Sequence, residues 1–235
     1  MAKRPSCADC IVKSSALCRV LSGRHLAELN RHSYRKRFPP GQLIAGITPD
    51  QDWFAIIVSG AIKLTKSLPD GRQQIVALLF PSDFLGRPFG LASSHTAETA
   101  TAVELCCFSR QHFEGLMRDQ AELKQQFLER TLDELETARD WMLRLGRSTA
   151  QEKLAAFILL MWRRIRAPEC ASCARPQAQP FDLPLSRSEI GDYLGLRIET
   201  VSRQLKALEA AGAIATGPGR VISVKDVQAL ERLTS

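Results

Sequence analysis

The stretch SRSEIGDYLGLRIETVSRQLKALEAAG, residues 186–212, has the spacing of two short helices joined by a tight turn. Ser186 is a suitable N-cap for the first helix. Gly195 ends that helix and provides the turn, because glycine readily adopts the left-handed backbone conformation. A second helix is predicted to begin at Ile198 and to end before Gly212. This is the spacing of a helix-turn-helix.

The second helix and its entry carry a set of polar residues. The apolar residues of the stretch can fold the two helices onto each other, which leaves outward-facing Arg197, Glu199, Thr200, Ser202, Arg203 and Lys206. Arginine can bind guanine through two hydrogen bonds in the major groove, and glutamate can accept one from cytosine. Serine and threonine can bind phosphate or contact the thymine methyl group. The set therefore predicts a DNA-reading helix, the alternative being a helical hairpin with a solvated polar face.

The residues that follow, AIATGPGRVISV at 213–224, have the pattern of two short strands around a GPGR turn. Such a hairpin beside a helix-turn-helix is the wing of a winged helix, and Arg220 in its turn is placed to meet phosphate. The cap, the glycine turn, the polar set and the wing agree with one another, which favours DNA binding over the plain hairpin.

The first half of the chain has a different character. From Phe38 to Phe108, short apolar runs alternate with turn residues such as PPG, SG, LPDG and PSD. The runs WFAIIV, AIKLT, QQIVALLF and TAVELCCF have strand length and β-branched or aromatic content. They predict a small antiparallel barrel or jelly roll, so the fold class is α+β.

One long helix is predicted over 111–147, where strong helix formers predominate and proline is absent. An apolar seam with a seven-residue repeat runs along it: Leu128, Leu135 and Met142, with Thr131, Ala138 and Leu145 three places after each. This seam predicts pairing of two copies of the helix, and packing of the helix on its own barrel is the alternative. A further amphipathic helix is predicted over 150–166, and a loop over 168–184.

Composition narrows the function classes. The chain has 235 residues and a formal net charge of +7, which favours a polyanionic partner such as nucleic acid. It contains neither an apolar run long enough to span a membrane nor the apolar core of a secretory signal, so we expect a cytoplasmic protein without a membrane partner. The sequence has no nucleophile elbow, P-loop or metal-hydrolase signature, and the histidines lack ligand spacing. An enzyme is therefore not expected.

Cysteines cluster near the N-terminus. The stretch SCADCIVKSSALC, residues 6–18, contains Cys7, Cys10 and Cys18 ahead of the predicted core. In a reducing cytosol such clusters indicate metal, iron–sulfur or redox chemistry rather than disulfides. A C-x-x-C pair alone is compatible with zinc, with an iron–sulfur cluster or with thiol redox chemistry.

The chain resembles the CRP/FNR family of transcription regulators. The resemblance is carried by the segments IVSGAIKL, PSDFLG, QEKLAAFI and SRSEIGDYLGLRIETVSRQL and by the wing. The resemblance implies an N-terminal antiparallel β-roll sensor (jelly-roll-like), a long dimerisation helix and a C-terminal winged helix-turn-helix. It divides the chain into a cysteine-rich segment, the sensor, the dimerisation helix and the DNA-binding domain, at 1–20, 21–110, 111–147 and 148–235.

The second helix of the motif looks like the FNR branch in particular. The branch's E-x-x-S-R triplet falls on Glu199, Ser202 and Arg203, which implies a palindromic target with TTGAT and ATCAA half-sites about four bases apart. The branch also implies activation or repression of anaerobic genes through RNA polymerase, with a contact near Gly71. Arg72 beside it departs from the family pattern.

The FNR branch further implies an oxygen-labile 4Fe–4S cluster held by three N-terminal cysteines and a fourth in the β-roll. Cys106 and Cys107 are adjacent, and neighbours in a strand point to opposite faces, so only one can reach the cluster. The family pattern, counted back from Leu116, selects Cys106 as the fourth ligand beside Cys7, Cys10 and Cys18, with Cys107 as the alternative.

Other sensors on the same fold remain open. A heme or thiol-redox sensor is one alternative. A cyclic-nucleotide sensor is disfavoured, since the chain reads Gly86-Arg87-Pro88 where nucleotide-binding relatives have Gly-Glu, and HTAETAT lacks the arginine of the phosphate clamp. Cys170 and Cys173 form a second C-x-x-C, expected to be free thiols. Ala138 replaces an acidic residue of some relatives, which predicts a dimer that tolerates cluster loss.

Overall fold

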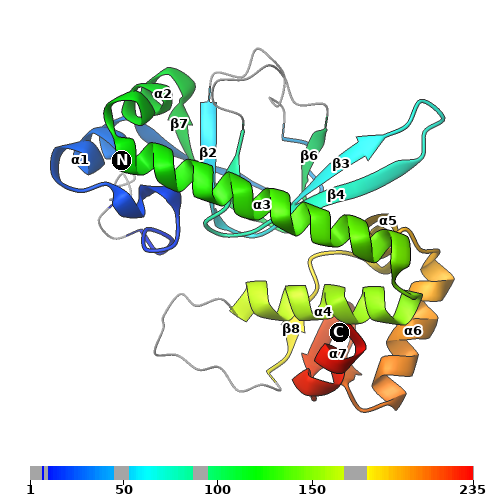
Figure 1. Cartoon of the computed structure of the whole chain (residues 1–235). Coiled ribbons are helices and arrows are strands. Elements are labelled where there is room, and N and C mark those ends of the chain that lie inside the picture. The colour runs from blue at the N-terminus through cyan, green and yellow to red at the C-terminus, as the bar shows by residue number, and fades with distance from the viewer. Residues whose placement is uncertain (1–6, 8–9, 45–52, 87–94, 167–178, 235) are drawn as a thin grey trace. The chain divides into compact units, whose positions relative to one another are not determined.

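The structure is a computed structural model that describes residues 7, 10–44, 53–86, 95–166 and 179–234. The chain divides into two compact units, Met1–Glu136 and Thr137–Ser235, each described by itself below (Figure 1). Within the described ranges, no helix has both the length and the apolar content needed to cross a bilayer.

The first unit contains two antiparallel sheets. One has the strand order β1-β7-β2-β5 and the other β4-β3-β6. The strands are β1 (Ser33–Phe38), β2 (Trp53–Ser59), β3 (Ile62–Ser67), β4 (Gln73–Leu79), β5 (Phe84–Leu85), β6 (Thr96–Thr99) and β7 (Val103–Ser109). The predicted runs correspond to β2, β3, β4 and β7, so the antiparallel roll is confirmed. The sequence analysis missed β1, β5 and β6.

Alternation along β7 divides the core of this unit. Cys106 and Phe108 are buried in one cluster, together with residues of the N-terminal segment and of the helix after β7. Leu105 and Cys107 are buried in a second cluster, formed with residues of β3, β4 and β6. The two adjacent cysteines therefore lie on opposite faces of the sheet, as the period of a strand requires.

The N-terminal segment belongs to the core instead of preceding it. A 3-10 helix η1 (Leu17–Val20) and helix α1 (Gly23–His32) follow the first cysteines. Ala16 and Leu17 are fully buried and Val12 nearly so, all in the cluster that contains Cys106. The expectation that the three cysteines lie ahead of the packed core is wrong, because these apolar residues between them pack onto the sheet.

The predicted helix over 111–147 is two helices, α2 (Arg110–Asp119) and α3 (Ala121–Arg147). Gln120 between them has an extended backbone, with φ −120° and ψ 101°. Its side-chain amide contacts the Asp119 carbonyl and the His25 ring, at 3.0 Å and 2.9 Å. The break separates α2, which buries Phe113, Leu116 and Met117, from α3, which buries Leu123 and Gln126. No proline or glycine marks this position in the sequence.

The second unit contains the predicted helix-turn-helix and wing. Its elements after α3 are α4 (Ala150–Arg166), β8 (Phe181–Asp182), α5 (Arg187–Leu194), α6 (Ile198–Ala210), β9 (Ile214–Thr216), β10 (Val221–Val224) and α7 (Val227–Thr234). The sheet order is β8-β10-β9. The two predicted wing strands are therefore confirmed. Strand β8 corrects the prediction of a loop over 168–184, since Phe181 and Asp182 pair with Ile222 and Val221.

Candidate functional site

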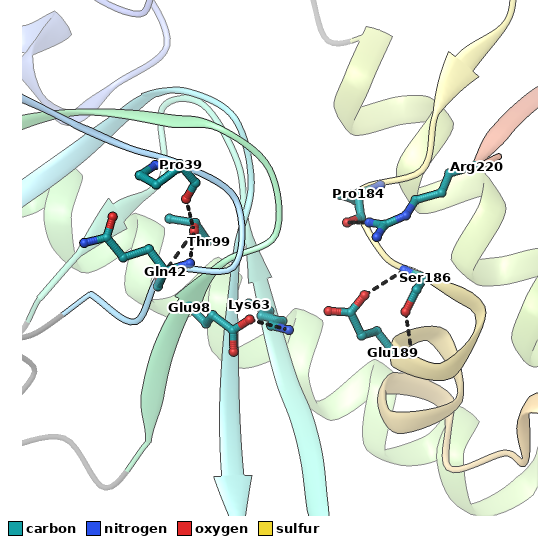
Figure 2. Close-up of polar contacts among 9 residues, drawn as sticks. All are labelled: Pro39, Gln42, Lys63, Glu98, Thr99, Pro184, Ser186, Glu189 and Arg220. Atoms are coloured by element: carbon teal, nitrogen blue, oxygen red, sulfur yellow. Dashed lines mark hydrogen bonds and ion pairs between the residues drawn. The ribbon is translucent and has the colours of Figure 1, made fainter.

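A complete capping box fixes the start of α5. The backbone N–H of Glu189 donates a hydrogen bond to the Ser186 hydroxyl at 3.3 Å, and the Ser186 N–H donates one to the Glu189 carboxylate at 2.8 Å (Figure 2). These bonds satisfy backbone donors that a helix start otherwise leaves unpaired. The serine that the sequence analysis selected as N-cap is confirmed.

The turn between α5 and α6 depends on two glycines. Gly195 has φ +64°, in the left-handed region, and it caps α5 as predicted. The sequence analysis missed the second, Gly191, where an added Cβ would lie 2.5 Å from the Leu196 carbonyl oxygen. This close approach brings the two helices together, and the buried residues Ile190, Leu194, Val201, Leu205 and Leu208 fill the space between them.

The outward face of α6 carries the predicted base-reading residues. Arg197, Glu199, Arg203 and Lys206 are exposed, and Thr200 and Ser202 are half-buried. Glu199, Ser202, Arg203 and Lys206 line one surface hollow together with Ile198. Among the residues that the structure describes, Glu199, Arg203 and Lys206 make no hydrogen bond or ion pair with one another or with other side chains. Their polar groups are available to an external partner.

Two side chains attach the wing to other parts of the second unit. Arg220 donates a hydrogen bond from Nη1 to the Pro184 carbonyl at 3.0 Å, while the residue as a whole stays exposed (Figure 2). The Glu209 carboxylate at the end of α6 accepts bonds from the N–H and hydroxyl of Thr216, both at 2.8 Å. These bonds hold the pKa of Glu209 below its ordinary value. The wing strand β9 is thereby attached to the reading helix.

The cysteine site lies in the first unit. Cys18 and Cys106 belong to one buried cluster, to which η1 and β7 both contribute, and the half-buried Cys10 packs against it. The Cys7 backbone N–H donates a hydrogen bond to the Asn30 side chain at 3.0 Å, which attaches this end of the segment to α1. Cys107 lies in the other cluster, away from the three N-terminal cysteines. The structure therefore brings together the predicted ligand set and separates Cys107 from it.

Burial and neighbouring thiols together shift the pKa values of the cysteines in this set. Burial, followed by the nearby Cys10 and Cys7, raises the pKa of Cys18 to about 11. Burial likewise raises the pKa of Cys106 to about 12; Arg35 opposes this shift, while Cys7 and Cys10 add to it. Burial is also the main cause of the raised pKa of Cys7. The thiols of Cys7, Cys18 and Cys106 are therefore protonated at neutral pH.

This donor set fits an iron–sulfur cluster in its chemistry, since four soft thiols share one region. The side chains fit the cluster in their chemistry but not in their arrangement. No group of three or more Cys, His, Asp or Glu side chains within the described residues is arranged to hold a single metal ion. A protonated thiol must lose its proton before it binds a metal, so binding would release protons and draw the sulfurs together.

An exposed apolar stripe runs along α3. Leu128, Leu135 and Met142, which carry the predicted seam, are 57%, 45% and 70% exposed. Thr131 and Ala138 are exposed and Leu145 is half-buried. Leu132 and Leu143, which the sequence analysis did not select, are also exposed and widen the stripe. Such a continuous apolar stripe on a helix is typical of an interaction surface.

The tight turn between β3 and β4 carries Gly71. Its φ of +86° lies in the left-handed region, and the Gly71 N–H donates to the Leu68 carbonyl at 3.0 Å. Arg72 and Asp70 form an ion pair at 2.8 Å, and the hydrogen bonds from Arg72 hold the pKa of Asp70 below its ordinary value. Leu68 is 53% exposed. The turn therefore presents a fixed, partly apolar tip.

Polar contacts also join β3 to β6 and the end of β6 to the segment after β1. Lys63 and Glu98 form an ion pair at 2.9 Å across β3 and β6 (Figure 2). The Thr99 hydroxyl donates to the Pro39 carbonyl at 2.6 Å and accepts from the Gln42 N–H at 2.9 Å. Arg87 and Pro88, as well as Cys170 and Cys173, lie outside the described residues.

Three histidines make contacts between the elements of the first unit. His32 and His112 stack with ring centroids 3.8 Å apart, and His25 contacts Gln120 at 2.9 Å. These contacts join α1 to α2, as expected for structural histidines.

The β-roll followed by a winged helix-turn-helix defines a DNA-binding transcription regulator with a sensor domain. Residues 35–120 match the family described as the cyclic nucleotide-binding domain, and residues 152–233 match the Crp-like helix-turn-helix domain. The chain belongs to the CRP/FNR family of transcription regulators, a family of regulators rather than enzymes.

Relatives match over nearly the whole chain. A probable transcriptional activator of Rhizobium leguminosarum is 42% identical over 98% of this chain and 93% of its own length. The transcriptional activator protein FnrL of Cereibacter sphaeroides is 41% identical, over 94% of this chain and 88% of its own. The structure of FixK2 from Bradyrhizobium japonicum matches with a TM-score of 0.76 at 32% identity, covering 86% of this chain and 98% of that one.

Proposed function

We propose that the protein is a homodimeric, oxygen-responsive regulator that holds a 4Fe–4S cluster on Cys7, Cys10, Cys18 and Cys106. The observation that carries the proposal is the position of Cys106, on the same face of β7 as the segment with the three N-terminal cysteines. Two parts of the chain that are far apart in sequence thus contribute thiols to one region, as a four-thiolate cluster requires.

The names of relatives agree with this sensing role. One relative is FnrL, a transcriptional activator, and the anaerobic regulatory protein of Pasteurella multocida is 27% identical over 97% of this chain. Carried over to this chain, these names favour regulation in response to oxygen.

Bound to the four thiolates, the cluster would supply an oxygen-labile crosslink between the N-terminal segment and β7. The segment is connected to α3, because Arg19 next to Cys18 donates a hydrogen bond to Gln126 at 2.6 Å. Gln126 is buried and also contacts Glu129, one residue after Leu128. A change in the cysteine segment can therefore alter the helix that carries the apolar stripe, which is a population shift between two arrangements.

In the proposed dimer, the stripe of α3 pairs with its copy through Leu128, Thr131, Leu135, Ala138, Met142 and Leu145. Pairing places two α6 helices one DNA turn, about 34 Å, apart, so that each reads one half-site of a TTGAT-N4-ATCAA-like palindrome. Ala138 adds no repulsion at the seam, so the dimer persists when the cluster is lost. The turn at Gly71, with Leu68 exposed, is the proposed contact for RNA polymerase.

The test is an anaerobic ultraviolet–visible spectrum of the purified protein with iron and sulfide analysis, repeated after exposure to air. The proposal expects about four irons and four sulfides per chain and a broad band near 400 nm that bleaches in air. It also expects tighter binding to the palindrome before bleaching than after. Metal-free, colourless protein with unchanged DNA binding in air would overturn it.

A thiol-redox sensor is the second candidate, because the described cysteines are free and are not arranged around a single metal ion. The same experiment distinguishes it: a colourless protein whose DNA affinity changes reversibly with oxidant and reductant is the thiol sensor. A sharp Soret band indicates heme.

A further inference from the structure

A buried arginine lies among the cysteines. Arg35 on β1 is directly opposite Cys106 on β7 in the antiparallel register, so the two side chains lie on the same face of the sheet. The Arg35 side chain is only 16% exposed. Its neighbours in β1, Tyr34 and Lys36, alternate to the other face, where Lys36 lies over the Trp53 ring. Arg37 shares the face of Arg35 but lies opposite Glu104 and is exposed, so Arg35 is the cation of SYRKRF that is buried opposite Cys106.

The guanidinium of Arg35 contacts the cysteine set directly. Its Nη2 donates a hydrogen bond to Cys10 Sγ at 3.4 Å. A guanidinium stays protonated in proteins, so Arg35 brings a permanent positive charge to the cysteine site.

The negative charge around Arg35 is incomplete. Arg35 Nη1 lies 3.5 Å from Glu104 Oε1. Nη1 is buried and makes no hydrogen bond within the described part of the chain. Glu104 is shared, since its Oε2 accepts a hydrogen bond at 2.7 Å from Arg37, a residue that is 82% exposed. A buried cation with an unfilled donor and a shared counter-ion is costly unless a further anion lies nearby.

We propose that Arg35 is the positioning and charge-compensating residue of the cluster site, where its guanidinium stabilises the negative charge of the cluster and its thiolates. This inference rests on the proposed function. Four thiolates around a doubly positive core carry a net charge of about minus two. Four protonated thiols would leave the Arg35 guanidinium with the shared Glu104 carboxylate as its counter-ion.

The positive charge of Arg35 favours reduction of the site and disfavours its oxidation. Adding one electron makes the site more negative, and a nearby cation favours that step. The same cation disfavours the loss of one electron to O2, which becomes superoxide. Arg35 is thus expected to raise the midpoint potential for one-electron reduction and to slow the loss of the cluster in air.

The test compares Arg35→Gln with Arg35→Lys and with a matched control, Arg37→Gln. Arg37 shares Glu104 with Arg35 but is exposed, and within the described residues it makes no hydrogen bond to a cysteine. Each variant is reconstituted anaerobically, its iron is counted, and its midpoint potential is measured by dye-mediated titration. The rate at which the 400 nm band bleaches in air-saturated buffer is the second readout.

We expect Arg35→Gln to have a more negative midpoint potential and to bleach roughly tenfold faster than the wild type. Arg35→Lys retains the charge and should lie closer to the wild type, and Arg37→Gln should match it. Equal potentials and equal bleaching rates for wild type, Arg35→Gln and Arg37→Gln would overturn the inference while leaving the cluster, and the proposed function, intact. A wild type without iron would refute both.

Where Arg35→Gln fails to fold, Glu104→Gln tests the same electrostatics with the opposite sign. It removes the negative charge nearest to the guanidinium, so we expect a less negative potential and slower bleaching. A shift in the other direction, or none, would overturn the inference.

Discussion

Arg19 Nε donates a hydrogen bond to Gln126 Oε1 at 2.6 Å, and this bond joins η1 to α3 across 107 residues of sequence. Gln126 is 7% exposed, although it is polar, and its amide also contacts Glu129. A buried polar side chain is retained where its hydrogen bonds are satisfied. The bond therefore links the residue after Cys18 to the helix with the exposed apolar stripe.

Replacing Arg19 should weaken the link between the cysteine segment and α3. We expect Arg19→Ala to lower the free energy of unfolding by about 1 kcal/mol, because Gln126 loses a charge-assisted partner. It should also reduce the difference in DNA affinity between anaerobic and air-exposed protein. Fluorescence anisotropy with a labelled palindrome measures both affinities. Arg24→Ala, which removes only an exposed contact with His25, is the control. An undiminished response to air in Arg19→Ala would contradict this coupling.

The two adjacent cysteines of β7 provide a matched pair of variants. Cys106→Ala should abolish the 400 nm band and bring iron close to zero, because one of four ligands is lost. Cys107→Ala should retain about four irons per chain and lose only about 1 kcal/mol of stability, the cost of a small cavity in the other core cluster. Iron analysis after anaerobic reconstitution distinguishes them. Loss of iron in Cys107→Ala alone would assign the fourth ligand to Cys107.

The apolar stripe on α3 should respond to a single charge. Leu135→Glu places two carboxylates at the proposed seam, where they repel each other and lose apolar burial, so we expect the dimer to dissociate at micromolar concentration. Sedimentation velocity measures the change. Asp140→Ala, on the same helix but turned away from Leu128, should leave the mass unchanged. If Leu135→Glu sediments like the wild type, the stripe is not the dimer interface.

Features that depend on neighbouring residues in the chain could be predicted from the sequence. Ser186 and Gly195 act through their own backbone neighbourhood, so the helix-turn-helix could be located from residue type and spacing. The opposite orientation of Cys106 and Cys107 follows from the period of a strand and needs no tertiary information. These features were accessible because each depends on only a few consecutive residues.

The features that the sequence did not reveal depend on distant partners. SYRKRF carries three cations and does not read as a strand, yet β1 forms because β7 supplies its hydrogen bonds and Glu104 its counter-charge. The break at Gln120 has no glycine or proline and results from packing of α2 and from contact with His25. Burial of Ala16 and Leu17 likewise requires the sheet face to which they bind. Tertiary context overrides local propensity at these positions.

The capping box of α5 should make a measurable contribution to stability. Ser186→Ala removes the acceptor of the Glu189 N–H and should cost about 1 kcal/mol, whereas Ser186→Thr retains a hydroxyl and should cost less. Urea unfolding monitored by circular dichroism gives both values. We also expect weaker DNA binding in Ser186→Ala, since the turn positions α6. Equal midpoints for the two variants would show that the cap bond contributes nothing.

Two arginines of the second unit should differ in how they affect sequence preference. Arg203 is exposed on α6 in the hollow lined by Glu199 and Ser202, so Arg203→Ala should cost about 1 to 3 kcal/mol on the palindrome and relax base preference at one position of each half-site. Arg220→Ala should weaken binding to all sequences alike and reduce the salt dependence, because phosphate contacts carry no sequence information.

Competition binding measures both effects, with the palindrome, single-base variants of each half-site and two salt concentrations. Arg232→Ala is the control, since this exposed residue of α7 contacts Asp226 at 3.7 Å and lies outside the reading helix and wing. Arg220 also bonds to the Pro184 carbonyl, so circular dichroism must first show that the wing of Arg220→Ala is folded. If Arg203→Ala discriminates among bases as well as the wild type does, α6 reads the groove through other side chains, and the assignment of Arg203 is wrong.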